Sequence, residues 1–492
     1  MRNLKNWIAA GLTIYASAVA ASAEKPNILF FFVDDMGWQD TSVPFHTEKT
    51  SLNRDYRTPN MEKLAARGLI FTNAYACAIC SPSRVSLMTG QNAARHGVTC
   101  WTLRKNISPE RQNKKLASAN WPLNGLQPAN SNVPASYASI TLPQRLREAG
   151  YRTIHAGKGH WGAKDTPGAN PKNLGFDVNI AGSYMGGPGS FHGDKNFSAK
   201  WRGGDAIWNI PGLEKYHGKK INLTEAITLE AIAAVEKSVA DKKPFYLYMS
   251  HYAVHAPFEP DRQFLPNYKD AKWSKHKKVY ASMLESMDRS LGDLLDSFDR
   301  LGVADNTIVI FMSDNGSPGA NPQNKPLKGD KISGYEGGTR VPMIVHWPKV
   351  TPAKQRTASP IIIEDIYPTF LEMAGLKTKR EIDGISFVEI LKNPQTDRSK
   401  RPLFWHYPNL YHRPPYSSVR LGDYKLIHWH ASNKLVLFNL KADIGERHDV
   451  SKNFPDITKH LAKLLSNHLR EAKALRLKDK ESNKPIPYPD EL

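Results

Sequence analysis

The sequence predicts an α/β protein with a large, mostly parallel sheet sandwiched by helices, followed by a small α+β subdomain with an antiparallel sheet. Apolar runs typical of strands alternate with helical segments from about residue 26 to residue 375. The first run, residues 28–33, holds six apolar residues in succession, which indicates a strand buried on both faces. After about residue 400 the runs become short and alternating, with turns between them.

The elements of the main sheet follow in chain order. Strands are expected at residues 28–33, 151–156, 245–250, 307–312 and 341–347. Helices are expected at residues 62–68, 141–150, 224–240, 279–301 and 362–374, with glycines at positions 68 and 150 suited to helix ends. Residues 102–139 and 182–204 are expected to form long loops, the second of them over a site.

The C-terminal part has its own pattern. Residues 417–421, 425–429 and 435–440 predict strands of an antiparallel sheet, and residues 455–475 predict a final helix. A chain of 492 residues also favours one large domain with a smaller one. We therefore expect a main domain over residues 24–400 and a C-terminal subdomain over residues 401–492.

Residues 1–23 have the features of an export signal. Arg2 and Lys5 precede an uncharged apolar stretch at residues 7–20, and Ala21-Ser22-Ala23 has the form of a cleavage site. The stretch is short for a membrane span, although an uncleaved anchor is the alternative. We expect a periplasmic or secreted protein with no stable membrane insertion.

The chain is strongly basic, with a formal net charge of +20. Such a surface attracts anionic partners, which include nucleic acids, membrane surfaces and polyanionic glycans. The lysines and arginines are spread along the chain and form no basic arm or stripe, so we do not expect a nucleic-acid partner.

The chain has three cysteines, Cys77, Cys80 and Cys100. An exported protein can form disulfides, but an odd number leaves one cysteine over. That cysteine is free, reactive, paired with another chain or modified.

Acidic residues follow two of the predicted strands. Asp34-Asp35 comes directly after the first strand, and Asp314-Asn315 follows the strand at residues 307–312. Ligands of an open α/β sheet bind at the carboxyl ends of its strands. Four oxygen-bearing side chains at one edge suit a hard divalent cation such as Ca²⁺ or Mg²⁺. The alternative for each pair is an ordinary turn or helix cap.

The segment Cys80-Ser81-Pro82-Ser83-Arg84 indicates the start of a helix, with Ser81 as the cap and Pro82 in the first turn. Cys80 would then lie beside free N–H groups that favour an anion, and Arg84 could reach back with charged hydrogen bonds. On these grounds a reactive group and a buried structural cysteine are both open.

The same segment, continued to Thr89-Gly90, resembles the signature of the formylglycine-dependent sulfatases of the alkaline phosphatase-like superfamily. Further motifs occur in the order of that family, over residues 25 to about 450. They are the opening segment KPNILFFFVDDMG, the element Gly157-Lys158-Gly159-His160-Trp161-Gly162, Val254-His255-Ala256-Pro257, Asp314-Asn315-Gly316, and PLKGDKISGYEGGTRVP around Lys331. Position 159 is commonly aromatic in relatives, so Gly159 is expected to open space near the substrate.

The resemblance implies that a maturation enzyme oxidises Cys80 to formylglycine (3-oxoalanine), which hydrates to a gem-diol. One hydroxyl attacks sulfur and forms a sulfo-enzyme intermediate. The other then loses its proton, expels sulfate and restores the aldehyde, a step for which a thiol has no equivalent group. The modification also leaves an even pair, Cys77 and Cys100.

The resemblance also implies a role for each matching residue. The metal, expected to be Ca²⁺, would be held by Asp34, Asp35, Cys80 as formylglycine, Asp314 and Asn315. The catalytic residues would be Cys80, Arg84, Lys158, His160, His255 and Lys331. In that set His160 is the base for the second hydroxyl, and His255 is the acid for the leaving alcohol. Lys328 is the alternative to Lys331, because the residues before Lys331 depart from the family pattern.

The expected substrate is a sulfated glycan, with a 4-sulfate of galactose or N-acetylgalactosamine as the specific expectation, since residues 47–103 resemble exo-sulfatases of polysaccharide degraders. Candidate contacts to the sugar are Arg95-His96, residues 101–104, Trp161, His192, His406-Tyr407 and His412-Arg413. The alternatives are a phosphatase or phosphonate monoester hydrolase of the same superfamily and a non-catalytic glycan-binding relative. A single-metal carboxylate set favours sulfate over phosphate.

Overall fold

The structure is a computed structural model that describes residues 25–318, 324–378 and 380–492. The expected signal segment, residues 1–23, lies outside the described residues. Within them, no helix is both apolar enough and long enough to cross a bilayer.

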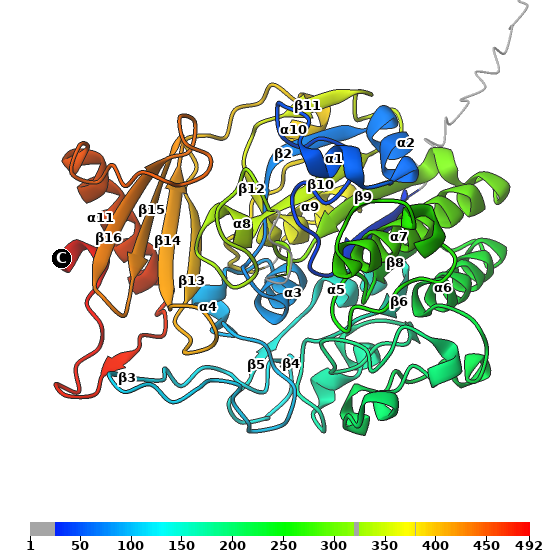
Figure 1. The fold of residues 1–492 in the computed structure, drawn as a ribbon, viewed down its shortest axis with the longest axis horizontal. Helices are drawn as coiled ribbons and strands as arrows, with labels where there is room; N and C mark the ends of the chain where they lie inside the picture. The colour runs from blue at the N-terminus through cyan, green and yellow to red at the C-terminus, as the bar shows by residue number, and fades with distance from the viewer. Residues whose placement is uncertain (1–24, 319–323, 379) are drawn as a thin grey trace, which may run out of the picture.

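The main sheet lies at the centre of the molecule (Figure 1). In the described residues its strands have the order β11-β2-β10-β9-β1-β8-β6-β7, and β12 pairs with β2. Strand β10 is antiparallel to both of its neighbours, and the other pairings are parallel. The strands are β1 (Asn27–Val33), β2 (Leu69–Tyr75), β6 (Arg152–Gly157), β7 (Val178–Ile180), β8 (Phe245–Ser250), β9 (Thr307–Ser313), β10 (Arg340–His346), β11 (Gln355–Thr357) and β12 (Ile361–Ile362).

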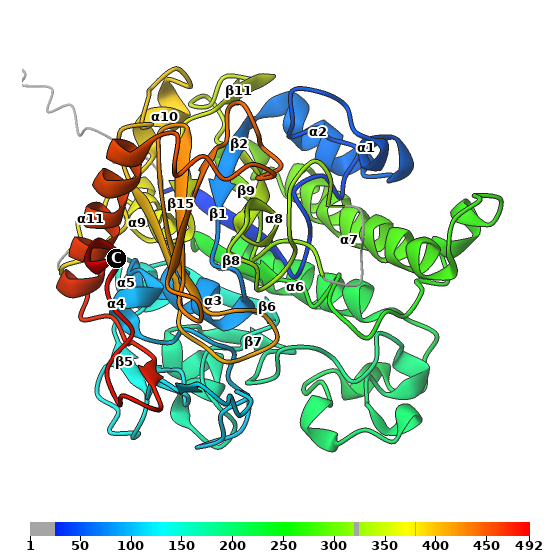
Figure 2. The ribbon, with the colours of Figure 1, turned by 60° about the vertical axis from the view of Figure 1, so that its left-hand side comes forward.

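Helices cover both faces of this sheet, and every residue of its central strands β1, β8 and β9 is buried. The side chains of Phe30 and Phe31 on β1 are both fully buried, but they pack into different core clusters on opposite faces. One face carries α2 (Pro59–Arg67), α6 (Leu223–Ala240) and α7 (Lys275–Arg300). The other carries α3 (Cys80–Thr89), α5 (Leu142–Glu148) and α9 (Ile366–Met373). Figure 2 shows α6 and α7 together on the side away from α9.

The C-terminal part forms a separate antiparallel sheet in the order β13-β14-β15-β16. Its strands are β13 (Leu403–Tyr407), β14 (Tyr416–Leu421), β15 (Tyr424–Trp429) and β16 (Lys434–Asn439). Helix α11 (Pro455–Glu471) packs against this sheet through its own apolar cluster, which includes Leu461 and Leu465 (Figure 1). The opposite face of the sheet adjoins the main core through residues such as Trp405 and Tyr416.

The remaining elements are short. They are α1 (Ser51–Asp55), α4 (Ala93–His96), α8 (Glu336–Thr339), α10 (Val388–Lys392), β3 (Leu116–Ala117), β4 (Leu126–Pro128), β5 (Tyr137–Ser139) and β17 (Lys478–Asp479), with several 3-10 turns. Three of them lie within residues 102–139, which is otherwise the long loop that the sequence predicts.

The predicted fold class is confirmed, and the expected strands of the main sheet agree with the structure to within one residue at each end. The strands that were not expected are β2 and β13 and the short strands β3, β4, β5, β7, β11, β12 and β17. Strand β2 follows α2 without a loop: a side chain on Gly68 would lie 2.5 Å from the carbonyl oxygen of Val345 on β10, so glycine lets the chain pass directly from helix to strand. Helix α7 also begins four residues before the expected start, and α11 ends four residues early.

Candidate active site

The carboxyl ends of β1 and β9 bring the predicted acidic residues together. The two strands pair in parallel, in register to their last residues, so Asp34 and Asp314 leave the sheet side by side. Asp35 has a left-handed backbone, and its N–H donates to Asp314 Oδ1 at 3.2 Å. Asn315 Nδ2 donates to Asp35 Oδ1 at 2.8 Å. The four side chains therefore form one buried group, as the sequence predicts.

Helix α3 points its N-terminus at this group. Cys80 is its first residue and Ile79 is the cap, so the helix begins two residues earlier than expected and Ser81 is not the cap. The Cys80 sulfur lies 3.6 Å from Asp34 Oδ1. Burial raises the pKa of the Cys80 thiol to about 12, so the thiol is protonated near neutral pH. A protonated thiol is a poor nucleophile.

Three cations neutralise the three carboxylates. Burying an unpaired carboxylate would be costly, and each one here has a basic partner within 3 Å. The pairs are Lys158 with Asp34 at 2.6 Å, Lys331 with Asp35 at 2.5 Å, and Arg84 with Asp314 at 2.8 Å. Burial opposes the charge on Lys331, but the neighbouring Asp35 raises its pKa well above the usual value.

Lys331, and not Lys328, lies at the acidic group. The ammonium of Lys328 donates to the carbonyl oxygen of Glu446 at 2.9 Å and lies 4.1 Å from the centre of the Tyr335 ring. It therefore points toward the C-terminal sheet, and its position favours Lys331 over Lys328 as the expected catalytic lysine.

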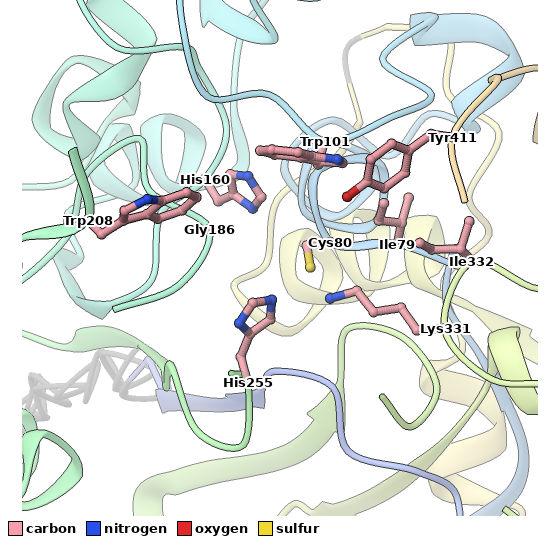
Figure 3. Close-up of a pocket in the computed structure, with 10 residues that line it drawn as sticks. All are labelled: Ile79, Cys80, Trp101, His160, Gly186, Trp208, His255, Lys331, Ile332 and Tyr411. Atoms are coloured by element: carbon pink, nitrogen blue, oxygen red, sulfur yellow. The ribbon is translucent and has the colours of Figure 1, made fainter. Parts of the chain in front are cut away.

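The His160 ring faces Cys80 from the end of β6 (Figure 3). Its Nε2 lies 2.8 Å from the carbonyl oxygen of Thr102, which can only accept, so Nε2 carries the proton. Burial, together with Lys158, lowers the pKa of His160 well below its usual value. The ring is therefore neutral, and its buried Nδ1 has no hydrogen-bond partner among the described residues. This nitrogen is free to accept a proton.

His255 approaches from the opposite side, after β8 (Figure 3). Its Nδ1 donates to the carbonyl oxygen of Ala256 at 2.7 Å, and its Nε2 lies 3.7 Å from Asp35 Oδ2. Burial, followed by the charge of Lys331, lowers the pKa of His255 to about 3. The ring is thus neutral, with its Nε2 lone pair facing the acidic group.

These side chains line one cavity of about 200 Å³. Figure 3 shows Cys80 at its floor, with His160, His255 and Lys331 pointing toward it. The remaining walls are formed by Ile79, Trp101, Gly186, Trp208, Ile332 and Tyr411. The cavity therefore combines charged groups at its base with aromatic rings around its mouth.

A protein-family model described as Sulfatase matches residues 26–376 of this chain. The chain belongs to the sulfatase family. A second model, described as N-sulphoglucosamine sulphohydrolase, C-terminal, matches residues 329–474. The family is one that uses a metal and formylglycine, and its fold is alkaline phosphatase-like.

Named relatives agree with this assignment. A protein named sulfatase from Formosa agariphila is 29% identical and covers 91% of this chain and 88% of its own length. N-acetylgalactosamine-6-sulfatase from Mus musculus is 30% identical, over 88% of this chain and 77% of the relative. The crystal structure of Ps i-CgsB is 30% identical with a TM-score of 0.75, over 91% of this chain and 93% of that one. Its complex with k-i-k-neocarrahexaose has a TM-score of 0.73.

The acidic group of this sulfatase fits a divalent cation. Ligand atoms of Asp34, Asp35, Cys80 and His255 all lie within 4.8 Å of one another. Asn315 uses both amide hydrogens on Asp35 and on the carbonyl oxygen of Gly316, and its buried Oδ1 has no partner in the described structure. An unpaired amide oxygen beside carboxylates is a donor set that Ca²⁺ and Mg²⁺ prefer.

Most expected sugar contacts of the sulfatase lie outside the cavity. Trp101 lines it, as expected. The others have partners elsewhere: Arg95 pairs with Asp383, His96 contacts Ser86, Trp161 stacks on Phe176, His192 lies beside Glu259, His406 bonds to Ser417, Tyr407 donates to the carbonyl oxygen of Tyr411, His412 contacts Arg111, and Arg413 pairs with Asp330. Of the expected residues 102–104, Thr102 donates to the carbonyl oxygen of Leu123, Leu103 accepts from the backbone N–H of Lys164, and Arg104 pairs with Asp205. None of these residues lines the cavity at Cys80, but His192 lines a separate depression, and their contact with a longer substrate stays a prediction.

Gly159 also differs from expectation. A side chain there would lie 2.6 Å from the carbonyl oxygen of Ser183, so the position is filled by backbone and opens no space. Two further aromatic residues, Trp208 and Tyr411, line the cavity with Trp101, and they were not among the expected sugar contacts. Both lie in long irregular segments with no motif, and only their place in the fold marks them.

Proposed function

We propose that this sulfatase removes sulfate from a sulfated glycan through a sulfo-enzyme intermediate on formylglycine made from Cys80. One divalent cation, Ca²⁺, would be held by Asp34, Asp35, Asp314 and Asn315 together with the modified residue 80. The observation that carries the proposal is the position of Cys80, at the N-terminus of α3 and 3.6 Å from an Asp34 oxygen, at the base of the cavity.

The hydrated aldehyde supplies two hydroxyls, one that bonds to sulfur as the sugar oxygen leaves and one whose deprotonation expels sulfate and restores the aldehyde. The chain supports that chemistry by position. The free N–H groups and dipole of α3 favour negative charge beside residue 80. The high pKa of the unmodified Cys80 thiol, about 12, makes a direct thiolate mechanism unfavourable.

A bound Ca²⁺ would polarise a sulfate oxygen and favour ionisation of the hydroxyl. The side chains around its site hold the carboxylates in place. Arg84 donates to Asp314 Oδ2 at 2.8 Å and to Ser250 Oγ at 2.6 Å, which fixes the guanidinium between two strands. Lys158 and Lys331 contribute positive charge for sulfate oxygens.

The two histidines have different proton states in this proposal. His160 accepts the proton of the second hydroxyl at Nδ1, because Nε2 is already bonded to the carbonyl oxygen of Thr102. His255 is the acid for the leaving sugar oxygen and must carry a proton on Nε2. An anionic sulfate beside His255 would raise its pKa from the low value that burial causes.

The proposed substrate is a 4-sulfate of galactose or N-acetylgalactosamine within a glycan. The mouse relative is named for the 6-sulfate of N-acetylgalactosamine, so its name supports the sugar and not the 4-position, and the structure of Ps i-CgsB was obtained with a k-i-k-neocarrahexaose. The aromatic rings of Trp101, Trp208 and Tyr411 around the mouth of the cavity suit the apolar faces of sugar rings. We further propose that residues 1–23 direct export to the periplasm or the medium, and that a formylglycine-generating or radical maturation enzyme acts on Cys80.

The decisive experiment joins mass analysis to a substrate panel. In protein from its native host, or co-produced with a maturation enzyme, the peptide containing Cys80 should be lighter than the thiol form by about 18 Da. That protein should hydrolyse an aryl sulfate in preference to the matching aryl phosphate. It should also prefer 4-sulfated to 6-sulfated galactose or N-acetylgalactosamine. An unmodified Cys80 in active protein would refute the formylglycine mechanism, and a phosphate preference would refute sulfate hydrolysis.

A further inference from the structure

The cavity at Cys80 continues into two further depressions. Trp208 and His255, which line the cavity (Figure 3), also line a depression of about 360 Å³ together with Arg202 and Pro257. The next residues along the same two segments, Trp201 and Phe258, line a third depression of about 1000 Å³. The second depression shares Trp208 and His255 with the cavity, and the third is lined by the direct chain neighbours of Arg202 and Pro257, from which we infer one path that leads away from Cys80. We call this path the Trp201 groove.

The outer part of the Trp201 groove is strongly basic. The cations that line the third depression are Lys195, Arg262, Lys269, Lys275 and Lys278, against a single carboxylate, Glu259. Glu259 pairs with Lys195 at 2.6 Å, and Arg262 pairs with Asp194. Among the described residues, no ion pair involves Arg202, Lys269 or Lys275, so positive charge remains for a ligand.

Two of these cations occupy an unfavourable position. Lys275 and Lys278 lie in the first turn of α7, and that turn contains no acidic residue. A helix N-terminus carries partial positive charge and prefers acidic side chains. Placing lysines there opposes the helix dipole, and an anion bound between them would relieve the repulsion.

Aromatic side chains lie beside the cations. Trp201 is 47% exposed, and its Nε1 donates to the carbonyl oxygen of Gly189 at 3.1 Å, which fixes the ring. The ammonium of Lys195 lies 3.7 Å from the centre of that ring. Phe258 and Trp273 line the same depression. Exposed rings beside cations suit a ligand with both apolar ring faces and anionic groups.

We propose that the Trp201 groove binds the continuation of a sulfated oligosaccharide whose reacting sugar lies over Cys80. The ligand carries both sugar faces and sulfate groups, and the groove holds both aromatic rings and cations such as Arg202, Lys269 and Lys275 that form no ion pair within the described residues. This inference rests on the proposed function, and it adds that the sulfatase recognises sulfated sugars beyond the one it desulfates. A nucleic acid is the competing occupant, since it also carries rings and anionic groups.

The test separates binding from turnover. The Cys80→Ala variant cannot be matured, so its affinity for a sulfated galactan hexasaccharide can be measured by calorimetry without hydrolysis. In that background we expect Trp201→Ala to weaken hexasaccharide binding about tenfold, as expected for a lost ring contact. Arg202→Gln should weaken it about fivefold, with a shallower salt dependence. A matched control is Lys459→Gln, which removes an exposed charge on α11 away from the groove.

The active enzyme provides the second measurement. In the matured protein, Trp201→Ala and Arg202→Gln should raise the KM for the hexasaccharide and leave kcat/KM for a sulfated monosaccharide within about twofold. The inference is overturned if both variants bind the hexasaccharide as tightly as their parent, or if a single-stranded oligonucleotide of equal charge competes equally well. Hexasaccharide binding without hydrolysis of any sulfate ester would refute the proposed function, but it would still support the Trp201 groove as a binding site for the oligosaccharide.

Discussion

Two clusters of buried charge in this sulfatase differ in their surroundings, because one lies at the base of a cavity and the other is enclosed within the packed chain. The Cys80 cluster consists of Asp34, Asp35, Asp314, Lys158, Lys331 and Arg84, at the carboxyl edge of β1 and β9. The Lys425 cluster consists of Glu336, Lys425 and Glu446 and joins α8 to the C-terminal sheet. In the Lys425 cluster, Glu336 accepts from Lys425 at 2.9 Å and from the Tyr75 hydroxyl at 2.7 Å.

Within each cluster the carboxyl pKa values are split. Burial opposes ionisation of Glu336, but Lys425 and Arg340 outweigh it and lower the pKa of Glu336 to about 2. At Asp34, burial and the adjacent carboxylates Asp314 and Asp35 outweigh Lys158, and the pKa is raised well above its usual value. Each cluster also holds the opposite case: burial raises the pKa of Glu446 to about 7, whereas at Asp35 burial is outweighed by Lys331, which lowers the pKa of that carboxyl. The Cys80 cluster crowds carboxylates together at a cavity, an arrangement that favours a ligand over stability.

The largest expected effect is the loss of activity on replacing Cys80, the residue at the centre of the Cys80 cluster. Cys80→Ala removes the residue that becomes the nucleophile, so kcat/KM for a sulfate ester should fall by at least about 10⁴-fold. The melting temperature should change little. Cys77→Ala is the matched control, because Cys77 is also buried and contacts Ser86 outside the cavity. Comparable activity loss in both variants would mean that Cys80 acts only through packing.

Breaking the Lys425 cluster should have the opposite result, a loss of stability with activity retained. Lys425→Met leaves two buried carboxylates without their ammonium partner, so the free energy of unfolding should fall by about 3–5 kcal/mol in denaturant titration. The activity per folded molecule should be retained. Lys434→Met, an exposed lysine on the neighbouring strand β16, should cost no more than about 0.5 kcal/mol. A stable Lys425→Met variant with lost activity would contradict the division between the two clusters.

Replacing each of the two candidate lysines tests which of them belongs to the catalytic Cys80 cluster. Lys331→Ala should lower kcat/KM about 10²-fold to 10³-fold, because it removes a positive charge aimed at the sulfate. Lys328→Ala should keep activity within a few-fold, since Lys328 contacts Tyr335 and the carbonyl oxygen of Glu446. The measurement is steady-state turnover of an aryl sulfate. The reverse order of effects would assign the catalytic role to Lys328.

The smallest expected effect is the stabilisation of the protein by Ca²⁺ bound to the carboxylates of the Cys80 cluster. Ca²⁺ at about 100 times its dissociation constant should stabilise the protein by about 2.7 kcal/mol, seen as a higher melting temperature than in a chelator. Asp35→Asn should remove most of this stabilisation. Lys434→Met should keep it, because β16 lies outside the site. Equal stabilisation of both variants by Ca²⁺ would place the cation elsewhere.

Much of the fold was predictable because its strands are apolar on both faces. Residues 245–250 are an uninterrupted apolar and aromatic run up to Ser250, and the expected strand matches β8 in both bounds. Strand β2 was missed because Thr72 and Asn73 interrupt its apolar pattern where the strand is partly exposed. The start of α7 was missed because its first turn is lysine-rich and lacks the usual acidic signal.

The sequence by itself determined which residues form the acidic group beside Cys80. Cys80 before a proline, acidic pairs after two apolar strands, and lysines and histidines in motif order are local patterns, and local patterns survive in the sequence. Tertiary structure alone decided which residues share the cavity. Trp101, Trp208 and Tyr411 come from three distant segments, and Lys331 was separated from Lys328 only by the direction of its side chain. Such choices depend on contacts between residues far apart in the chain, which no local pattern encodes.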